Sequence, residues 1–179
     1  ESFIENVDAL IAECLATEPF QPTLRFKGGT EVLQPRLITW LADDPKLTYT
    51  YSGVFLEPKR MPPLIKGLSL KLQDQLGAKF PTCLLNLYRN GNDSVGWHSD
   101  NEKELGKNCT IAAISLGAER VFELQKRSDK KQKASQRLKS GSLVVMAGAT
   151  QSIWAHQIPK EPSVNEMRIS LTFRPHVKA

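Results

Sequence analysis

A strict alternation of apolar and polar residues runs from Arg168 to Arg174 (RISLTFR). Neighbouring side chains of a strand point to opposite faces, so Ile169, Leu171 and Phe173 would share one face and the polar residues the other. The pattern predicts an amphipathic strand over 167–174. Its polar face could lie in water, as in many amphipathic strands, or line the inside of a barrel.

Helical periodicity occurs twice, over residues 2–15 and 64–77. Shorter strand-like segments lie at 34–40 and 47–55. From residue 80 onward the candidate strands are 82–89, 109–117, 119–126, 142–147, 152–158 and 167–174. Two helices followed by many short strands predict an α+β fold, with the helices on one face of a β-sandwich. We expect a single domain, because 179 residues suffice for one substantial core.

The composition restricts the class of protein and its expected location. Hydrophobic residues make up 40% of the chain and charged residues 24%, which is typical of a globular protein. No apolar run reaches the roughly 20 residues of a membrane span, and no signal peptide is expected. The three cysteines are widely spaced and odd in number. They favour a reducing, intracellular location, either bacterial cytoplasm or eukaryotic nucleus.

The net charge of +5 is concentrated in residues 126–139 (KRSDKKQKASQRLK), which hold seven Lys or Arg and one Asp. A segment this basic is either a solvated surface loop or a hairpin that contacts nucleic-acid phosphates. The sequence leaves both interpretations open. The side chains that would contact phosphate are Lys126, Arg127, Lys130, Lys131, Lys133 and Arg137.

Residues 84–102 contain the first candidate metal ligands. The segment begins as a strand in which Leu84, Asn86 and Tyr88 would share one face, and it continues through a turn rich in Asn and Gly to His98-Ser99-Asp100. In an extended segment His98 and Asp100 face the same side. One imidazole and one carboxylate are two of the three ligands in the facial triad that binds non-haem Fe(II).

The third ligand must come from elsewhere in a chain that has only three histidines. His156 lies in the predicted strand 152–158, whereas His176 lies near the end beside a proline. A lone histidine on an apolar strand is usually a core residue. Together with His98 and Asp100, however, His156 completes a facial triad. Such a triad leaves three coordination positions open, two for a 2-oxo acid and one for O2.

The polar face of the strand 167–174 then acquires a second interpretation. Inside a barrel, Arg168 and Arg174 would be buried with no acidic partner on their own strand, and buried charge needs pairing. A dicarboxylate such as 2-oxoglutarate supplies that pairing, because guanidinium groups match carboxylates. The two Cα atoms would lie roughly 20 Å apart. The arginines would therefore approach the cosubstrate from opposite ends.

Two tyrosines occur in the strand-like segment 47–55. Tyr49, Tyr51 and Gly53 would share one face of a continuous strand. They are either half-buried sheet residues or a platform on which a base stacks, a contact that contributes about 1–3 kcal/mol per base.

Four motifs together resemble those of a known enzyme family. They are Asn86-Leu87-Tyr88, His98-Ser99-Asp100, His156 and Arg168 to Arg174. Over residues 34–174 the chain resembles the AlkB family of Fe(II)- and 2-oxoglutarate-dependent dioxygenases, in its nucleic-acid repair branch. The resemblance implies one domain over residues 1–179, with a double-stranded β-helix (jelly-roll) core over about 80–175. Helices would support one face, and an N-terminal nucleotide-recognition lid would cover about 18–63.

The resemblance also implies site roles. The catalytic iron would be held by His98, Asp100 and His156. Arg168 and Tyr88 would bind the far carboxylate of 2-oxoglutarate, Arg174 and Asn86 would serve its iron-chelating end, and Thr172 and Ser170 would line the same site. Many relatives carry Asn at position 170. Tyr51 would stack on the flipped base. Further substrate contacts would come from Tyr49, Thr50, Asn101, Glu102 and Phe20.

The implied activity is oxidative demethylation of alkylated nucleobases, such as 1-methyladenine and 3-methylcytosine, in DNA or RNA. It would use Fe(II), 2-oxoglutarate and O2 and release formaldehyde, succinate and CO2. The base must be flipped out of a duplex or lie in a single strand. The alternatives are the same chemistry on RNA modification marks or a protein side chain, and a non-catalytic nucleic-acid-binding module. The expected partner is alkylated DNA or RNA, bound by a monomer without a membrane association.

Overall fold

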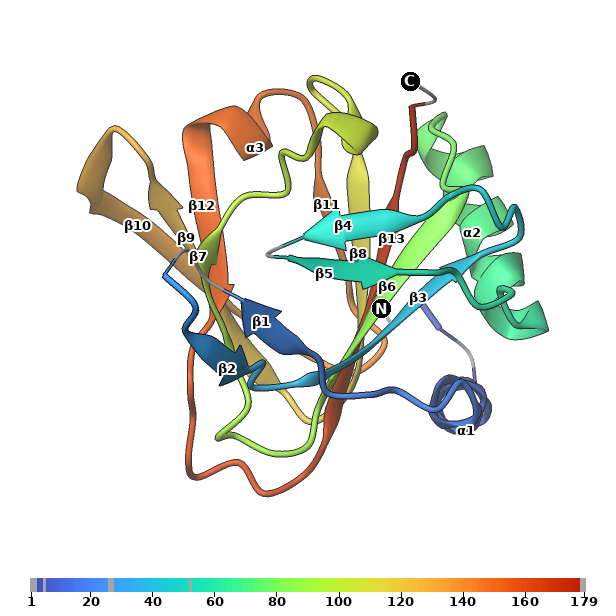
Figure 1. Ribbon diagram of the computed structural model, residues 1–179, viewed down its shortest axis with the longest axis horizontal. Coiled ribbons are helices and arrows are strands. Elements are labelled where there is room, and N and C mark those ends of the chain that lie inside the picture. The colour runs from blue at the N-terminus through green and yellow to red at the C-terminus, as the bar shows by residue number, and fades with distance from the viewer. Residues whose placement is uncertain (1–2, 5, 26–27, 52, 178–179) are drawn as a thin grey trace.

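Two antiparallel sheets face each other in the computed structural model (Figure 1), which describes residues 3–4, 6–25, 28–51 and 53–177. The five-stranded sheet has the order β11 (Leu143–Met146), β8 (Ile111–Gly117), β13 (Arg168–Arg174), β6 (Thr82–Tyr88) and β3 (Leu37–Ala42). The four-stranded sheet has the order β10 (Asp129–Leu138), β9 (Arg120–Lys126), β12 (Trp154–Ile158) and β7 (Val95–His98).

The chain passes back and forth between these sheets. From β6 onward, β6, β8, β11 and β13 join the five-stranded sheet, and β7, β9, β10 and β12 join the four-stranded sheet. This winding is that of a double-stranded β-helix, so the expected jelly-roll is confirmed. The predicted strands from residue 80 onward are all present, with ends shifted by a few residues.

The helices cover the outer face of the five-stranded sheet (Figure 1). Residues of α1 (Val7–Ala16) and α2 (Pro63–Leu76) share one apolar cluster with Ile169, Leu171 and Phe173 of β13. Each such buried side chain contributes about 1.5–3 kcal/mol by leaving water. The prediction that β13 is amphipathic is therefore confirmed, and its polar face points away from the helices into the space between the sheets.

The first helix begins later than predicted. Residues 2 and 5 of the predicted helix 2–15 lie outside the described residues. The backbone N–H of Phe3 donates to the carbonyl of Gly141 at 2.8 Å, which holds the chain in a non-helical course. The side chain of Asn6 then caps the helix by accepting from the N–H of Ala9. The second helix ends at Gly77 as predicted. A single turn of helix, α3 (Thr150–Ile153), and a short 3-10 turn (Lys103–Leu105) were not predicted.

Residues 49–51 and 54–56 form the two strands of a hairpin, so the prediction of one continuous strand over 47–55 is wrong. The hairpin consists of β4 (Tyr49–Tyr51) and β5 (Val54–Leu56), and Gly53 makes the turn with a φ of 77°. That conformation strains residues with a side chain. A second small hairpin pairs β1 (Thr23–Arg25) with β2 (Glu31–Leu33). The lid expected over 18–63 stays a prediction, and its segment includes β3, which belongs to the core sheet.

The basic segment 126–139 consists of the end of β9, a turn and β10, so it is a hairpin rather than a loop. Most of it forms β10, which pairs with β9 and shows a register shift between Asp129 and Lys133. Figure 1 shows this hairpin projecting from the edge of the four-stranded sheet.

In the described part of the chain, no helix is both long and apolar enough to cross a bilayer.

Candidate active site

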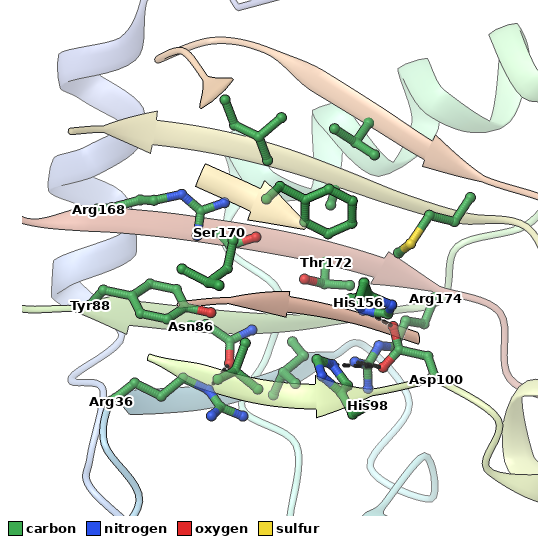
Figure 2. A pocket seen from close by; sticks show the side chains of 18 residues that line it. Arg36, Asn86, Tyr88, His98, Asp100, His156, Arg168, Ser170, Thr172 and Arg174 are labelled. Carbon is green, nitrogen blue, oxygen red and sulfur yellow. Dashed lines mark hydrogen bonds and ion pairs between the residues drawn. The ribbon is translucent and has the colours of Figure 1, made fainter. Parts of the chain in front are cut away.

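The two sheets enclose a cavity, and the polar faces predicted from sequence alternation line it (Figure 2). From β6 come Leu84, Asn86 and Tyr88, and from β13 come Arg168, Ser170, Thr172 and Arg174. The four-stranded sheet closes the opposite wall, which includes His98 and His156. Arg168 and Tyr88 lie at one end of this cavity, whereas the two histidines, Asp100 and Arg174 lie at the other.

The three predicted metal ligands meet at this second end. His98 ends β7, and its Cα partner across the sheet is His156 of β12. The two ring centroids are 4.3 Å apart. Nε2 of His98 lies 4.0 Å from Oδ1 of Asp100, and Nε2 of His156 lies 3.7 Å from Oδ2. One donor atom from each of the three residues falls within 4.8 Å of the others.

The electrostatics of the cluster favour ligation. Burial raises the pKa of Asp100, but Arg174 and the two imidazoles outweigh burial, so the pKa is lowered and the carboxylate stays ionised. Burial and the neighbouring His98 lower the pKa of His156 to about 4, which keeps this imidazole neutral near pH 7. Nδ1 of His98 lies 2.8 Å from the carbonyl of Gly96, so a proton there leaves Nε2 with a lone pair.

The donor set fits a divalent iron. Oδ2 of Asp100 is buried and has no hydrogen-bond partner. Leaving a buried carboxylate oxygen without a donor is costly, and a bound cation removes that cost. Two imidazoles and one carboxylate on one side are the ligands of non-haem Fe(II). The residues present therefore suit the metal that the sequence predicts.

Arg174 already has an acidic partner. Its Nη2 donates to Oδ1 of Asp100 at 2.6 Å, and its Nη1 donates to the hydroxyl of Tyr49 at 2.9 Å. The expectation that both arginines depend on a cosubstrate for pairing is therefore wrong for Arg174. The physical reason is that Asp100 lies far from Arg174 in sequence but next to it in the folded chain.

Arg168, at the other end, fits the expectation. It is 2% exposed, its Nη2 donates to Oγ of Ser115 at 2.9 Å, and its guanidinium lies 5.2 Å from the ring centroid of Tyr88. Its Nε and Nη1 have no hydrogen-bond partner. Burial lowers the pKa of Arg168, which marks a charge that is poorly compensated. An incoming carboxylate of 2-oxoglutarate would satisfy these two donors.

One cavity residue and two residues that support the cavity were not predicted from the sequence. Arg36 is 9% exposed, and its Nε donates to Oδ1 of Asn86 at 2.7 Å. Oε1 of Gln151 accepts from the backbone N–H of Asp100 at 2.9 Å and so fixes that ligand. No local pattern marks either residue, because each contact joins segments about 50 residues apart. Ser115 lies on a predicted strand, but only the fold brings it to Arg168.

The structure joins two of the predicted substrate residues, Tyr49 and Glu102, by a hydrogen bond. Tyr49 is 3% exposed and stacks on Trp40 with centroids 4.6 Å apart, so of the two interpretations that the sequence left open, the structure favours a packed sheet residue over a base-stacking platform. Its hydroxyl donates to Glu102. Thr50 and Asn101 are exposed. Phe20 is 46% exposed and pairs through its backbone with Ile38 of β3. The side chain of Tyr51 lies outside the described residues.

The basic hairpin contains two kinds of cation. Arg137 forms ion pairs with Glu161 at 2.9 Å and Glu119 at 3.8 Å, so its charge is offset. Lys130 and Lys131 are exposed. The ammonium of Lys133 lies 5.8 Å from the ring centroid of Trp97, which is 37% exposed. The side chains of Lys126 and Arg127 contact Gln132 and the carbonyl of Ser152, respectively.

The chain is similar to proteins of known family. The sequence profile of the 2OG-Fe(II) oxygenase superfamily matches residues 4–174. A human protein named alpha-ketoglutarate-dependent dioxygenase alkB homolog 3 is 35% identical over 180 residues, which cover 96% of this chain and 62% of that protein. A protein of Arabidopsis thaliana named DNA oxidative demethylase ALKBH2 is 36% identical over 179 residues, covering 86% of this chain and 57% of that protein.

A solved structure of OsALKBH1 has the same fold, with a TM-score of 0.67 at 18% identity, covering 93% of this chain and 90% of that chain. The chain spans about three fifths of the length of the two curated relatives, 62% of one and 57% of the other.

Proposed function

The chain belongs to the AlkB family within the 2OG-Fe(II) oxygenase superfamily, and on this premise we propose that it is an oxidative demethylase of alkylated nucleobases. The substrate would be a base such as 1-methyladenine or 3-methylcytosine in DNA or RNA. The names of the relatives, which include a DNA oxidative demethylase, support a nucleic-acid substrate.

One observation carries the proposal: three metal donors and an under-paired, buried arginine lie at opposite ends of one cavity. We assign His98, Asp100 and His156 to Fe(II). When bound, iron supplies the activation of O2 that converts 2-oxoglutarate into succinate and CO2 and oxidises the N-methyl group, which leaves as formaldehyde.

The residues of the chain would hold the cosubstrate between these two ends. The free Nε and Nη1 of Arg168 would donate to the far carboxylate, with Tyr88 and Ser115 fixing the guanidinium. Asn86, oriented by its hydrogen bond with Arg36, would serve the end beside the metal. The same wall of the cavity continues with Ser170 and Thr172.

Part of the cavity wall is apolar. Phe122 and Leu138 line it from the four-stranded sheet and Val144 and Met146 from β11, and the ring of Phe122 lies 5.5 Å from that of His156. Such a wall excludes water from reacting groups and strengthens the electrostatic contacts inside. This environment suits an oxidation that must act on the methyl group rather than on solvent.

A base must leave its stack to reach this cavity. We propose that Tyr51, Thr50, Asn101, Glu102 and Phe20 contact it. The exposed lysines of the β9–β10 hairpin would bind phosphates, together with Lys126 and Arg127 and without a large contribution from Arg137. We also propose a monomeric, intracellular protein. The three cysteines are all free thiols, which supports a reducing compartment.

The test is an oligonucleotide with a single 1-methyladenine or 3-methylcytosine, incubated with Fe(II), 2-oxoglutarate and O2. We expect the oligonucleotide to lose the mass of one CH2 unit and succinate to form in equal amount. Parallel reactions with methylated RNA and methylated peptide identify the preferred substrate class. Turnover on peptide alone would contradict the nucleic-acid assignment. Nucleic-acid binding without turnover, unaffected by His98→Ala, would indicate a non-catalytic module.

A further inference from the structure

Hydrogen bonds connect Tyr49, in the β4–β5 hairpin, to the candidate metal ligand Asp100. Stacking on Trp40 and burial fix the position of the Tyr49 ring. The Tyr49 hydroxyl donates to Oε1 of Glu102 and accepts from Nη1 of Arg174 at 2.9 Å. Nη2 of Arg174 in turn donates to Oδ1 of Asp100 at 2.6 Å, an ion pair that Figure 2 places beside the two histidines.

The direction of each hydrogen bond follows from the groups involved. A phenol has one proton, and a carboxylate can only accept, so the Tyr49 proton points to Glu102 and an oxygen lone pair faces Arg174. The two terminal nitrogens of Arg174 are thereby divided, with one on Tyr49 and one on a single oxygen of Asp100. The other oxygen, Oδ2, is buried and accepts no hydrogen bond.

This one-oxygen contact differs from the arrangement that an isolated arginine and carboxylate favour. Such pairs often form two parallel N–H···O bonds, one to each oxygen. In that arrangement Arg174 would place an N–H on Oδ2 of Asp100, the oxygen that is otherwise open to a cation. The Tyr49 hydroxyl binds Nη1 and so opposes the fork that uses both terminal nitrogens of Arg174.

We propose that Tyr49 is a positioning residue for the metal site, which keeps Oδ2 of Asp100 open to the metal by holding Arg174 in contact with Oδ1 only. The inference rests on the metal site of the proposed function and adds a residue of the predicted lid segment to it. It also assigns a role to Tyr49, whose buried ring is not accessible for stacking on a base.

Loss of the Tyr49 hydroxyl should therefore weaken metal binding. Tyr49→Phe keeps the ring and its stacking on Trp40 and removes only the oxygen that Arg174 contacts. Groups that orient a metal ligand typically change affinity by about 10–100-fold when removed. We expect a rise of about tenfold in the dissociation constant for Mn(II).

A matched control removes a buried hydroxyl elsewhere. Thr39, on β3, is 1% exposed, and its Oγ1 accepts from Oγ1 of Thr17 at 3.2 Å, without a contact to the metal donors. Calorimetric titration of metal-free protein with Mn(II), without cosubstrate, compares the wild type, Tyr49→Phe and Thr39→Val. The proposal predicts weaker binding for Tyr49→Phe alone. Equal affinities for Tyr49→Phe and the wild type, or an equal loss in Thr39→Val, would overturn it.

A double variant separates positioning from a general loss of structure. Lysine at position 174 has a single ammonium and lacks the fork of two nitrogens that places one N–H on each oxygen of Asp100. In an Arg174→Lys chain, Tyr49→Phe should change the Mn(II) dissociation constant less than about twofold, since Tyr49 then has no fork to oppose. A loss as large as in the native background would count against the proposal, and thermal unfolding of each metal-free variant verifies folding. A wild-type chain that does not bind Mn(II) would instead refute the metal site and, with it, the proposed function.

Discussion

His98 and His156 are Cα partners on the adjacent antiparallel strands β7 and β12, with ring centroids 4.3 Å apart. The pairing register of these strands, and not a local motif, brings the second imidazole to the His98-x-Asp100 pair. A shift of the register by one residue would turn His156 away from the cavity.

Removing one imidazole should abolish metal binding. His156→Ala leaves two ligands, which hold Fe(II) or Mn(II) too weakly for catalysis. We expect no calorimetric signal with Mn(II) and no demethylation. His176→Ala is the matched control, because His176 lies beyond β13 and does not line the cavity. Retention of metal affinity by His156→Ala would show that the metal lies elsewhere.

Arg168 should favour binding of 2-oxoglutarate and lower the stability of the metal-free chain. Arg168→Met removes the charge expected to face the far carboxylate, so the KM for 2-oxoglutarate should rise at least about tenfold. Mn(II) affinity without cosubstrate should stay unchanged, because Arg168 lies at the opposite end of the cavity. The metal-free variant should be about 1 kcal/mol more stable, since a buried and poorly paired cation is lost. Steady-state kinetics and thermal unfolding measure the two effects, and an unchanged KM would contradict the assignment.

The β9–β10 hairpin should contribute to nucleic-acid binding through its exposed lysines, Lys130 and Lys131. A Lys130→Ala/Lys131→Ala variant should bind an oligonucleotide more weakly, and the slope of log K against log salt should become shallower by about 0.7–0.9 per lost phosphate contact. Arg137→Ala should have a smaller effect, because Glu119 and Glu161 already offset its charge. Fluorescence anisotropy across a range of salt concentrations provides the slopes. Equal slopes for the lysine variant and the wild type would place the nucleic acid elsewhere.

Acid should destabilise the metal-free chain through His156. Burial and His98 lower the pKa of this histidine to about 4, compared with an ordinary value of 6.5. Between these values the unfolded chain binds a proton that the folded chain does not, so stability is lost as the pH falls from about 6.5 to about 4. The loss should be about 3 kcal/mol, and a His156→Gln variant should show clearly less. Chemical denaturation across this range provides the comparison.

Two glycines should respond to alanine in opposite directions. A Cβ at Gly91 would lie 1.7 Å from the carbonyl oxygen of Glu161, so Gly91→Ala should cost about 3 kcal/mol or more. Gly67, inside α2, has open space at this position, and Gly67→Ala should stabilise the chain by about 0.5–1 kcal/mol. Thermal unfolding of the two variants measures whether each change lowers or raises the stability of the chain. A neutral Gly91→Ala would mean that the turn at Gly91 and the loop at Glu161 are not closely packed.

Two of the patterns with a fixed period were read correctly from the sequence. The two-residue period of β13 and β6 predicted which side chains share a face, and the fold turns these faces toward the cavity. The alternation of Tyr49 and Tyr51 was misleading, since the same pattern continues through Gly53, where the chain turns. A short stretch of alternating residues does not distinguish one strand from two halves of a hairpin.

Long-range pairings could not be read from the sequence. The contacts of Arg174 with Asp100 and of Arg36 with Asn86 join residues 74 and 50 positions apart, and each depends on the register of several strands. The facial triad was an exception, because two imidazoles and one carboxylate have a chemistry specific enough to be recognised before their geometry is known.

A crystal structure of the chain with Mn(II) and 2-oxoglutarate would show whether one cavity holds a metal at one end and the far carboxylate of 2-oxoglutarate at the other. We expect Mn(II) bound by His98, Asp100 and His156, with Nε and Nη1 of Arg168 donating to the cosubstrate carboxylate. Mn(II) bound outside this triad, or a cosubstrate that leaves Arg168 without a carboxylate partner, would contradict this expectation.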